Sequence, residues 1–453
     1  MKRNFYMGAA FMATLAALGV GSRILDKRSV AQAASGQVPK FEVDPMWPKP
    51  LPNHWIMGNV IGVSVDSNDH IWIIHRQGSL EAMELYGVAN PPPGANKRHN
   101  GVVESECCVP APPVLEFDEQ GNLLNHWGGE PEDHSYEWPN SNHGIFVDFK
   151  GNVWIGGNGR GTPPGMEGRG RGARGGARGA APAAARGTAD ESAPAARGPI
   201  YYHDSMVMKF TQDGKFLGQI GKPGASKGSN DTENLGLPAK ETVDPKTNEL
   251  YVADGYGNRR VIVFDADTMK YKRHWGAYGH TPDDTPTPPY SPDAPISQQF
   301  RNPVHCADLS HDGLLYVCDR VNDRIQVFKP DGTFVKEKIL YKNTLGDGAV
   351  WDIAFSKDAA QKYIYLADGA NEKVHILDRD TLDVLTSFGD GGRQPGEFYA
   401  VHSIATDSKG NIFTTETYRG QRIQKFVYKG LGPVTGENEG VLWPKTAKSP
   451  LTK

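Results

Sequence analysis

The chain has 453 residues and a formal net charge of −4 at pH 7, with 53 glycines and 33 prolines. This near-balanced charge gives no electrostatic reason to expect a nucleic acid as partner. The glycine and proline content is typical of a fold with many turns.

The first 33 residues predict an export signal peptide. Lys2 and Arg3 precede an apolar stretch at 5–20, and the small-residue sequence Ala-Gln-Ala at 31–33 offers a cleavage site. The apolar stretch is short and rich in alanine and glycine, so we expect no stable membrane anchor. The start KRNFYM also resembles a twin-arginine signal, which leaves both the Sec and the twin-arginine route open. We therefore expect an exported protein, periplasmic or secreted.

Six hairpins follow the signal segment and a strand-like segment at 38–45. Each hairpin has two β-rich apolar runs around a turn. They span 60–76, 141–157, 238–255, 303–320, 349–369 and 400–417. A second hairpin follows most of them, as at 258–276 and 323–340. Four strands per repeat and weak helical periodicity predict an all-β fold, a six-bladed β-propeller.

The ring of blades must also close. The last repeat offers a third strand at 421–429 but no clear fourth. We infer that 38–45 completes the last blade and ties the two ends of the chain together. The propeller is then expected over 38–430, with a C-terminal tail at 431–453.

Three histidines occupy the same position in alternate hairpins. His143, His305 and His402 stand at the entry to the first strand of the second, fourth and sixth hairpins. Alternation around a six-bladed ring places them about 120° apart, so the imidazoles can converge near the axis. Three imidazoles with an open fourth position describe a catalytic zinc site. The other histidines considered lack the shared position and are interpreted as structural or surface residues: His54, His75, His126, His134 and His375.

Three more residues belong to the same face of the disc. In an up-and-down blade, the start of strand one and the end of strand two lie together, and Arg76, Tyr256 and Arg320 stand at or just after ends of strand two. Tyr256 can act as a general base if the metal and nearby arginines stabilise its phenolate. The planar donor forks of the arginines suit a substrate carboxylate. The alternatives are a packing role for Tyr256 and pairing of the arginines with blade carboxylates such as Asp319.

Two inserts interrupt the repeats. A proline-rich loop spans 87–113, and a low-complexity segment of Gly, Arg, Ala and Pro spans 156–199. The second cannot bury a core and is predicted to be disordered. It leaves the second repeat after strand two, on the face of the histidines. It is either a lid or tether to an anionic surface, or a tolerated loop insertion.

The chain has four cysteines. Cys306 and Cys318 flank one hairpin turn in nearly opposite register, which allows a cross-strand disulfide in an oxidising compartment. Two small apolar residues in a packed blade are the other interpretation. Cys107 and Cys108 are adjacent in the proline-rich loop, and no CxxC spacing supports a metal thiolate pair there.

With these residues the chain resembles the peptidyl-α-hydroxyglycine α-amidating lyases, six-bladed propellers with NHL-type repeats. The likeness runs from about residue 41 to 426 outside the inserts. It is most specific at GVSVDSNDHIWIIHR, NHGIFVDFKGNVW, YVADGYGNRRVIVF, VHCADLSHDGLLYVCDRVNDRIQVF and VHSIATDSKGNIF. The resemblance implies that the three histidines hold zinc, that Tyr256 is the base, and that Arg76 and Arg320 are active-site residues.

The resemblance also implies a reaction. The family cleaves the C–N bond of a peptidyl α-hydroxyglycine and releases a peptide amide and glyoxylate. For this chain we expect a small-molecule or peptide substrate with a carboxylate, and a monomer.

Several positions depart from the family. Its structural calcium uses an aspartate directly after the third histidine, where this chain has Ser403, and backbone carbonyls that map to Val63 and Ile145. Ala400 replaces a methionine of the pocket, and Gly257 replaces a cysteine. The sequence does not include the monooxygenase domain that makes the hydroxyglycine, so the chemistry can be kept while the substrate differs.

Two other functions remain open. A zinc hydrolase or lactonase on the same scaffold would need a carboxylate near the metal as base, and Glu241 and Asp352 are the candidates. A non-catalytic NHL-repeat propeller would bind a protein, glycan or ligand, with the arginine-rich insert carrying the interaction.

Overall fold

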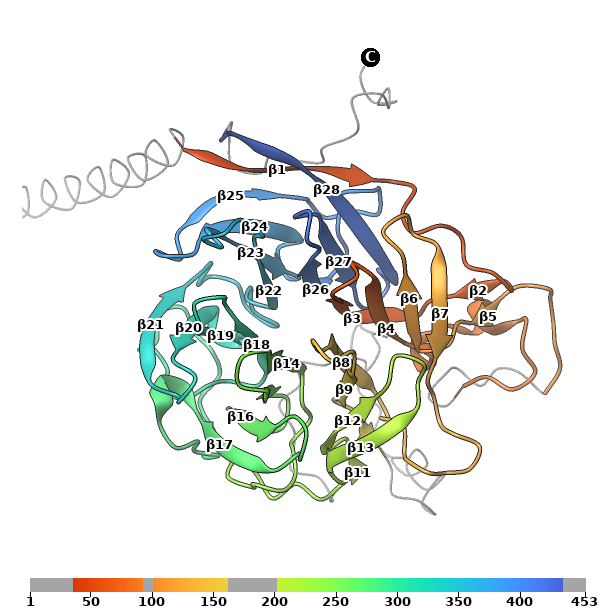
Figure 1. Cartoon of the computed structure of the whole chain (residues 1–453), viewed down its shortest axis with the longest axis horizontal. Coiled ribbons are helices and arrows are strands. Elements are labelled where there is room, and N and C mark those ends of the chain that lie inside the picture. Colours follow the sequence, from red (N-terminus) through yellow and green to blue (C-terminus); the bar gives the residue numbers. More distant parts are fainter. Residues whose placement is uncertain (1–35, 93–100, 162–201, 435–453) are drawn as a thin grey trace, which may run out of the picture.

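The computed structural model describes residues 36–92, 101–161 and 202–434, which form the predicted six-bladed β-propeller (Figure 1). The expected signal peptide, nearly all of the 156–199 insert and most of the C-terminal tail lie outside these residues. Within the described ranges, no helix is long and apolar enough to cross a membrane.

Each blade is a four-stranded antiparallel sheet, with its first strand nearest the axis. The first three blades are β3 (Asn59–Val65), β4 (Ile71–Arg76), β6 (Val114–Phe117) and β7 (Leu123–Trp127); β8 (Asn142–Val147), β9 (Val153–Gly157), β12 (Met206–Phe210) and β13 (Phe216–Gly221); and β14 (Lys240–Asp244), β15 (Glu249–Asp254), β16 (Arg260–Asp265) and β17 (Tyr271–Trp275).

The second half of the ring repeats this order. Its blades are β18 (Val304–Leu309), β19 (Leu315–Asp319), β20 (Arg324–Phe328) and β21 (Phe334–Ile339); β22 (Asp352–Phe355), β23 (Tyr363–Asp368), β24 (Lys373–Asp378) and β25 (Val384–Phe388); and β26 (Val401–Thr406), β27 (Ile412–Glu416), β28 (Arg422–Pro433) and β1 (Gln37–Asp44).

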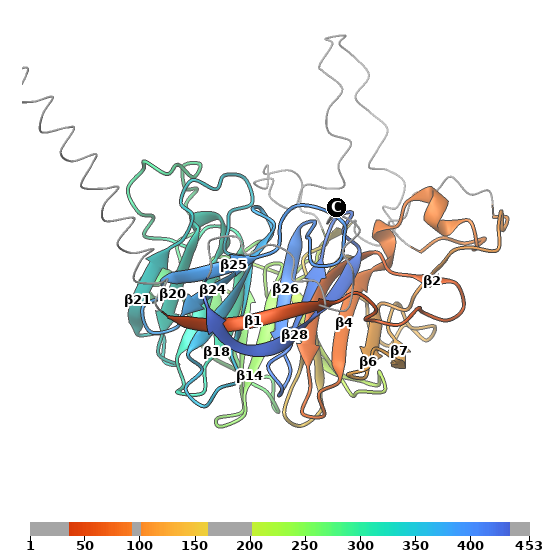
Figure 2. The same ribbon diagram turned by 90° about the horizontal axis from the view of Figure 1, so that it is seen from above.

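The ring closes as the sequence predicts. β1 pairs antiparallel with β28, with Phe41 opposite Tyr428, and so supplies the outer strand of the last blade (Figure 2). Blade 6 is therefore built from both ends of the described chain. This pairing closes the ring, because β1 precedes the first blade in the chain and pairs within the last one.

Apolar side chains fill the space between neighbouring blades. One cluster packs Trp72 of the first blade with Ile155 and Phe210 of the second, and another packs Phe41 of the sixth blade with Tyr365 of the fifth. These contacts stack the blades so that the ends of the innermost strands meet at one place on the axis.

The connecting segments add short elements. β2 (Trp55–Ile56) pairs with β5 (Val109–Pro110), and β10 (Arg160–Gly161) pairs with β11 (Tyr202–His203). Four short 3-10 helices complete the described elements: η1 (Gln77–Ser79), η2 (Ala82–Leu85), η3 (Ala277–Gly279) and η4 (Arg320–Asn322). β9 continues to Gly157, two residues into the expected insert.

Both cysteine pairs form disulfides. Cys306 and Cys318 are register partners on β18 and β19 and form the cross-strand disulfide, one of the two interpretations that the sequence left open. Cys107 and Cys108 are bonded to each other. No described cysteine is free.

Candidate functional site

The three histidines meet at the axis of the ring. They lie on the innermost strands β8, β18 and β26 of alternate blades, and their ring centroids are 4.8 to 5.2 Å apart. One nitrogen from each lies within 4.8 Å of the others. Only 2%, 3% and 1% of His143, His305 and His402 is exposed. The sequence-based prediction of convergence therefore holds in the structure.

Each imidazole is oriented by a backbone carbonyl of the following blade. The hydrogen bonds from Nδ1 run from His143 to Ala239 (2.7 Å), from His305 to Trp351 (2.5 Å) and from His402 to Ile61 (2.7 Å). Donation through Nδ1 places the lone pair of the neutral ring on Nε2, the arrangement that metal-binding histidines use.

The acceptors occupy the same repeat position as the histidines. His143 stands five residues before Asp148, which begins the hairpin turn, and Ala239 stands five residues before Asp244 in the next repeat. The same offset relates His402 to Asp407. Histidines and carbonyl acceptors thus alternate around the ring. Each even-numbered blade donates a histidine hydrogen bond to the odd-numbered blade that follows it.

The electrostatics of the cluster suit a metal ion. Burial, together with repulsion from His402, Arg320 and His143, lowers the pKa of His305 well below 6.5. A neutral imidazole is the form that binds metal, and three nitrogen donors leave a fourth position for another ligand. The residues present therefore fit a zinc ion.

Tyr256 lies at the edge of the three imidazoles. Its hydroxyl oxygen is 3.1 Å from Nε2 of His143 and 3.0 Å from Nε2 of His305. Arg320 donates to the same oxygen through Nη1 at 3.2 Å. A phenol oxygen thus sits between the cluster and a fixed cation, as a general base at this site requires.

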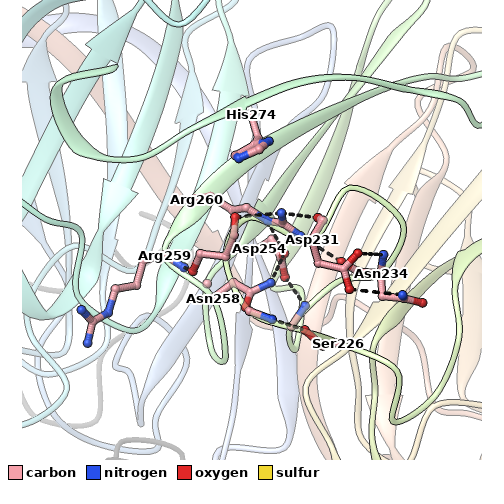
Figure 3. A network of polar contacts seen from close by, with 12 residues as sticks. Ser226, Asp231, Asn234, Asp254, Asn258, Arg259, Arg260 and His274 are labelled. Atoms are coloured by element: carbon pink, nitrogen blue, oxygen red, sulfur yellow. Dashed lines mark hydrogen bonds and ion pairs between the residues drawn. The ribbon is translucent and has the colours of Figure 1, made fainter. Parts of the chain in front are cut away.

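A buried polar network holds the turn that carries Tyr256 (Figure 3). Asp254, the last residue of β15, accepts hydrogen bonds from Gly236, Asn258 and Arg260 at 2.7 to 2.8 Å. Arg260 is fully buried and also donates to three carbonyls of the loop 229–234. The network fixes the turn after β15 and so the direction of the phenol.

Arg320 is buried and directed at the site. Its guanidinium lies 4.5 Å from the Trp351 ring, and Nη2 is 3.4 Å from Asp347. The alternative of pairing with a carboxylate holds for Arg320 in part: its ion-pair partner is Asp347, whereas Arg324 binds Asp319 at 2.6 Å. The guanidinium of Arg320 therefore lies beside the Tyr256 hydroxyl, next to the three histidines.

Arg76 reaches the cluster through the residue before His143. Its Nε donates to the Asn142 carbonyl at 3.0 Å, and its Nη2 donates to Asn158 at 2.8 Å. All six residues predicted from the sequence thus come together at one end of the innermost strands. Their catalytic and metal-binding roles remain predictions.

The three histidines also line a cavity between the innermost strands, here called the axial cavity, whose charged residues the sequence analysis did not combine. Lys240, Asp352, Ser403 and Ile145 line it together with the three histidines. Burial alone would lower the pKa of Lys240, but its attraction to Asp308 and Asp352 outweighs burial and raises that pKa above its usual value. The sequence feature that could have indicated this role is the position of Lys240 directly after Ala239, the residue whose carbonyl accepts the hydrogen bond from His143.

Two other clusters of potential metal ligands among the described residues are less suited to a metal ion. The first comprises Cys306, Asp308 and Asp352, but the cysteine is in a disulfide and Lys240 binds both carboxylates. The second comprises Asp66, His70 and Glu116. Its Asp66 already accepts from Trp72 and two backbone N–H groups.

Fold and site together define a six-bladed β-propeller with a buried three-histidine cluster at its axis. No family model matches the chain. It is similar to the peptidyl-glycine alpha-amidating monooxygenases B and A of Xenopus laevis, at 27% and 34% identity over 207 residues, which are 45% of this chain. The chain spans about a fifth of these relatives' length, 21% and 20%.

Two further comparisons cover most of the chain. NHL repeat-containing protein 3 of Mus musculus is 23% identical over 407 residues, 86% of this chain and 84% of that protein. Among solved structures, a streptogramin B lyase aligns with a TM-score of 0.43 and 12% identity, covering 88% of this chain and 99% of that one. By sequence, the chain is therefore similar to an NHL-repeat protein and to the amidating monooxygenases.

Proposed function

We propose that this protein is an exported zinc-dependent lyase that cleaves the C–N bond of an α-hydroxyglycine-like hemiaminal. The products are an amide and glyoxylate. The observation that carries the proposal is the convergence of three imidazole nitrogens within 4.8 Å, with the Tyr256 hydroxyl within hydrogen-bonding distance of His143, His305 and Arg320. The similarity to the amidating monooxygenases supports it.

Each of these residues has its own role in the proposed reaction. Zinc held by three imidazoles would polarise the substrate hydroxyl oxygen as a Lewis acid. Tyr256 takes the hydroxyl proton, and its oxygen accepts the hydrogen bond from Arg320 more strongly as a phenolate. Arg320 and Arg76 bind the substrate carboxylate, which fixes the hydroxyl beside Tyr256.

The reaction balances without water or a redox cofactor. Loss of the hydroxyl proton lets the C–O bond become the carbonyl of glyoxylate. The C–N bond breaks, and its electron pair goes to the nitrogen, which takes up a proton to give the amide. The proton lost by the hydroxyl and the proton gained by the nitrogen cancel, so no other reactant is consumed.

The hydrolase alternative lacks a placed base. Glu241 is fully buried, and no described residue forms a hydrogen bond with its carboxyl oxygens. Those oxygens lie in the space beside Gly144 and Gly156, where a Cβ would come within 2.2 Å of them. Asp352 is bound to Lys240 and Ser403. Neither carboxylate is available to activate a water at the histidines.

The test is release of glyoxylate from an N-acyl-α-hydroxyglycine by the purified zinc-loaded chain. Tyr256→Phe should abolish most of the activity with the metal content unchanged, and the exposed Tyr399→Phe serves as the matched control. Stoichiometric zinc without glyoxylate release would contradict the lyase. A protein that neither contains nor takes up zinc would leave the non-catalytic binding propeller as the better account.

A further inference from the structure

Lys240 places an ammonium inside the axial cavity. It opens β14, and its Nζ lies 2.9 Å from Asp308 on β18 and 2.6 Å from Asp352 on β22. One cation thus joins the innermost strands of three consecutive blades. The side chains of Lys240, Asp308 and Asp352 are only 12%, 17% and 2% exposed, so solvent and salt screen this attraction little.

The connection continues to a fourth blade. The second carboxylate oxygen of Asp352 accepts a hydrogen bond from the Ser403 hydroxyl at 2.6 Å and another from the Ile404 N–H at 3.1 Å. Ser403 directly follows His402 on β26. The charged residues of the cavity are therefore tied to the strand that carries the third histidine.

Lys240 and Asp352 also adjoin the carbonyls that orient the other two imidazoles. Lys240 follows Ala239, whose carbonyl accepts from His143. Asp352 follows Trp351, whose carbonyl accepts from His305. The network thus adjoins the carbonyl acceptors of His143 and His305, and it adjoins His402 itself through Ser403.

The calcium ion implied by the resemblance does not fit this cavity. Ile145 and Ser403, two of its expected ligand positions, line the cavity beside Lys240. Residue 403 offers a hydroxyl that donates to Asp352, where calcium would need a carboxylate. The two carboxylates that remain nearby already bind Lys240.

We propose that the Lys240 ammonium is the resident cation of the axial cavity and positions the three histidines without a second metal ion. By holding Asp308, Asp352 and, through Asp352, Ser403, it fixes the Ala239 and Trp351 carbonyls, to which His143 and His305 are bonded, and the strand that carries His402. Lys240 is a positioning residue, because it acts through the backbone. The inference rests on the proposed zinc site, but the role of Lys240 as a cation is measured separately.

The experiment compares the wild type, Lys240→Met and Lys150→Met. Lys150 forms an exposed ion pair with Asp267 of the neighbouring blade at 2.7 Å and is the matched control. Zinc affinity is measured by competition with a chelating dye, and Tm is measured with calcium and with EDTA. Lys240→Met should bind zinc about 10- to 100-fold more weakly, the usual effect of losing residues that orient metal ligands.

The calcium response separates the explanations. Lys240→Met leaves Asp308 and Asp352 without their cation, so calcium should raise its Tm while the Tm of the wild type and of Lys150→Met stays unchanged. A wild type that is stabilised by calcium overturns the proposal, and so does Lys240→Met with wild-type zinc affinity.

Ser403→Ala keeps the test decisive if Lys240→Met does not fold. It removes one hydrogen bond to Asp352 and leaves every charge in place. It should fold and bind zinc several-fold more weakly, and unchanged zinc affinity would overturn the proposal. A wild type that binds no zinc would refute the proposed lyase, while the calcium comparison would still decide whether Lys240 is the resident cation.

Discussion

Glu241→Gln should stabilise the protein increasingly as the pH rises. Glu241 is fully buried, and its carboxyl oxygens have no hydrogen-bond partner among the described residues. Burial raises the pKa of this carboxyl from 4.5 to about 8, more than the attraction of Lys240 lowers it. The folded chain therefore carries a neutral acid at pH 7, whereas the unfolded chain carries a carboxylate there.

The sign and size of the effect follow from proton linkage. Between pH 4.5 and 8 the folded state binds one more proton at Glu241 than the unfolded state, so the free energy of unfolding falls as the pH rises. The slope is about 1.4 kcal/mol per pH unit, which amounts to roughly 3 kcal/mol at pH 7. Glutamine has a similar shape and no titrating proton, so the free energy of unfolding of the variant does not fall in this way as the pH rises.

Urea unfolding of the wild type and Glu241→Gln from pH 5 to 8 measures the difference. The advantage of the variant should grow by about 4 kcal/mol over this range. Glu233→Gln, which changes an exposed carboxylate, is the control and should shift stability by less than about 0.5 kcal/mol at every pH. A difference between the wild type and Glu241→Gln that does not change with pH would refute the reasoning.

Further changes test the metal site, the base, the buried network and the disulfide. His305→Ala should lose the roughly one zinc per chain expected of the wild type in metal analysis, and retained zinc would contradict the ligand assignment. Tyr256→Phe should lower kcat for glyoxylate release about 10²- to 10⁴-fold, and a smaller loss would exclude a role as the base. Arg260→Met breaks a fully buried ion pair and should cost about 3–5 kcal/mol in denaturant unfolding. Replacing Cys306 and Cys318 by serine should cost about 3 kcal/mol, and a Tm that does not respond to this replacement would show that the disulfide adds no stability.

The repeat pattern predicted the fold because each blade is a local unit. Alternating apolar residues and turns within 60–76 or 303–320 specify hairpins whose partners are close in sequence, so register follows from the turn. The pairing of β1 with β28 was also predictable, since a propeller must close and the last repeat lacked a strand. The 3-10 helices and the β2–β5 pair were not predicted, because nothing periodic marks them.

The sequence by itself determined where the three histidines, Tyr256, Arg76 and Arg320 would lie, because a shared repeat position becomes a shared place around the axis. Only the tertiary structure decided what surrounds them. The pairing of Arg324 with Asp319 directs Arg320 to the site, and the inward turn of Lys240 fills the cavity with an ammonium. These contacts join different blades, and their outcome depends on side-chain rotamers, burial and competition between neighbours, which no repeat pattern records.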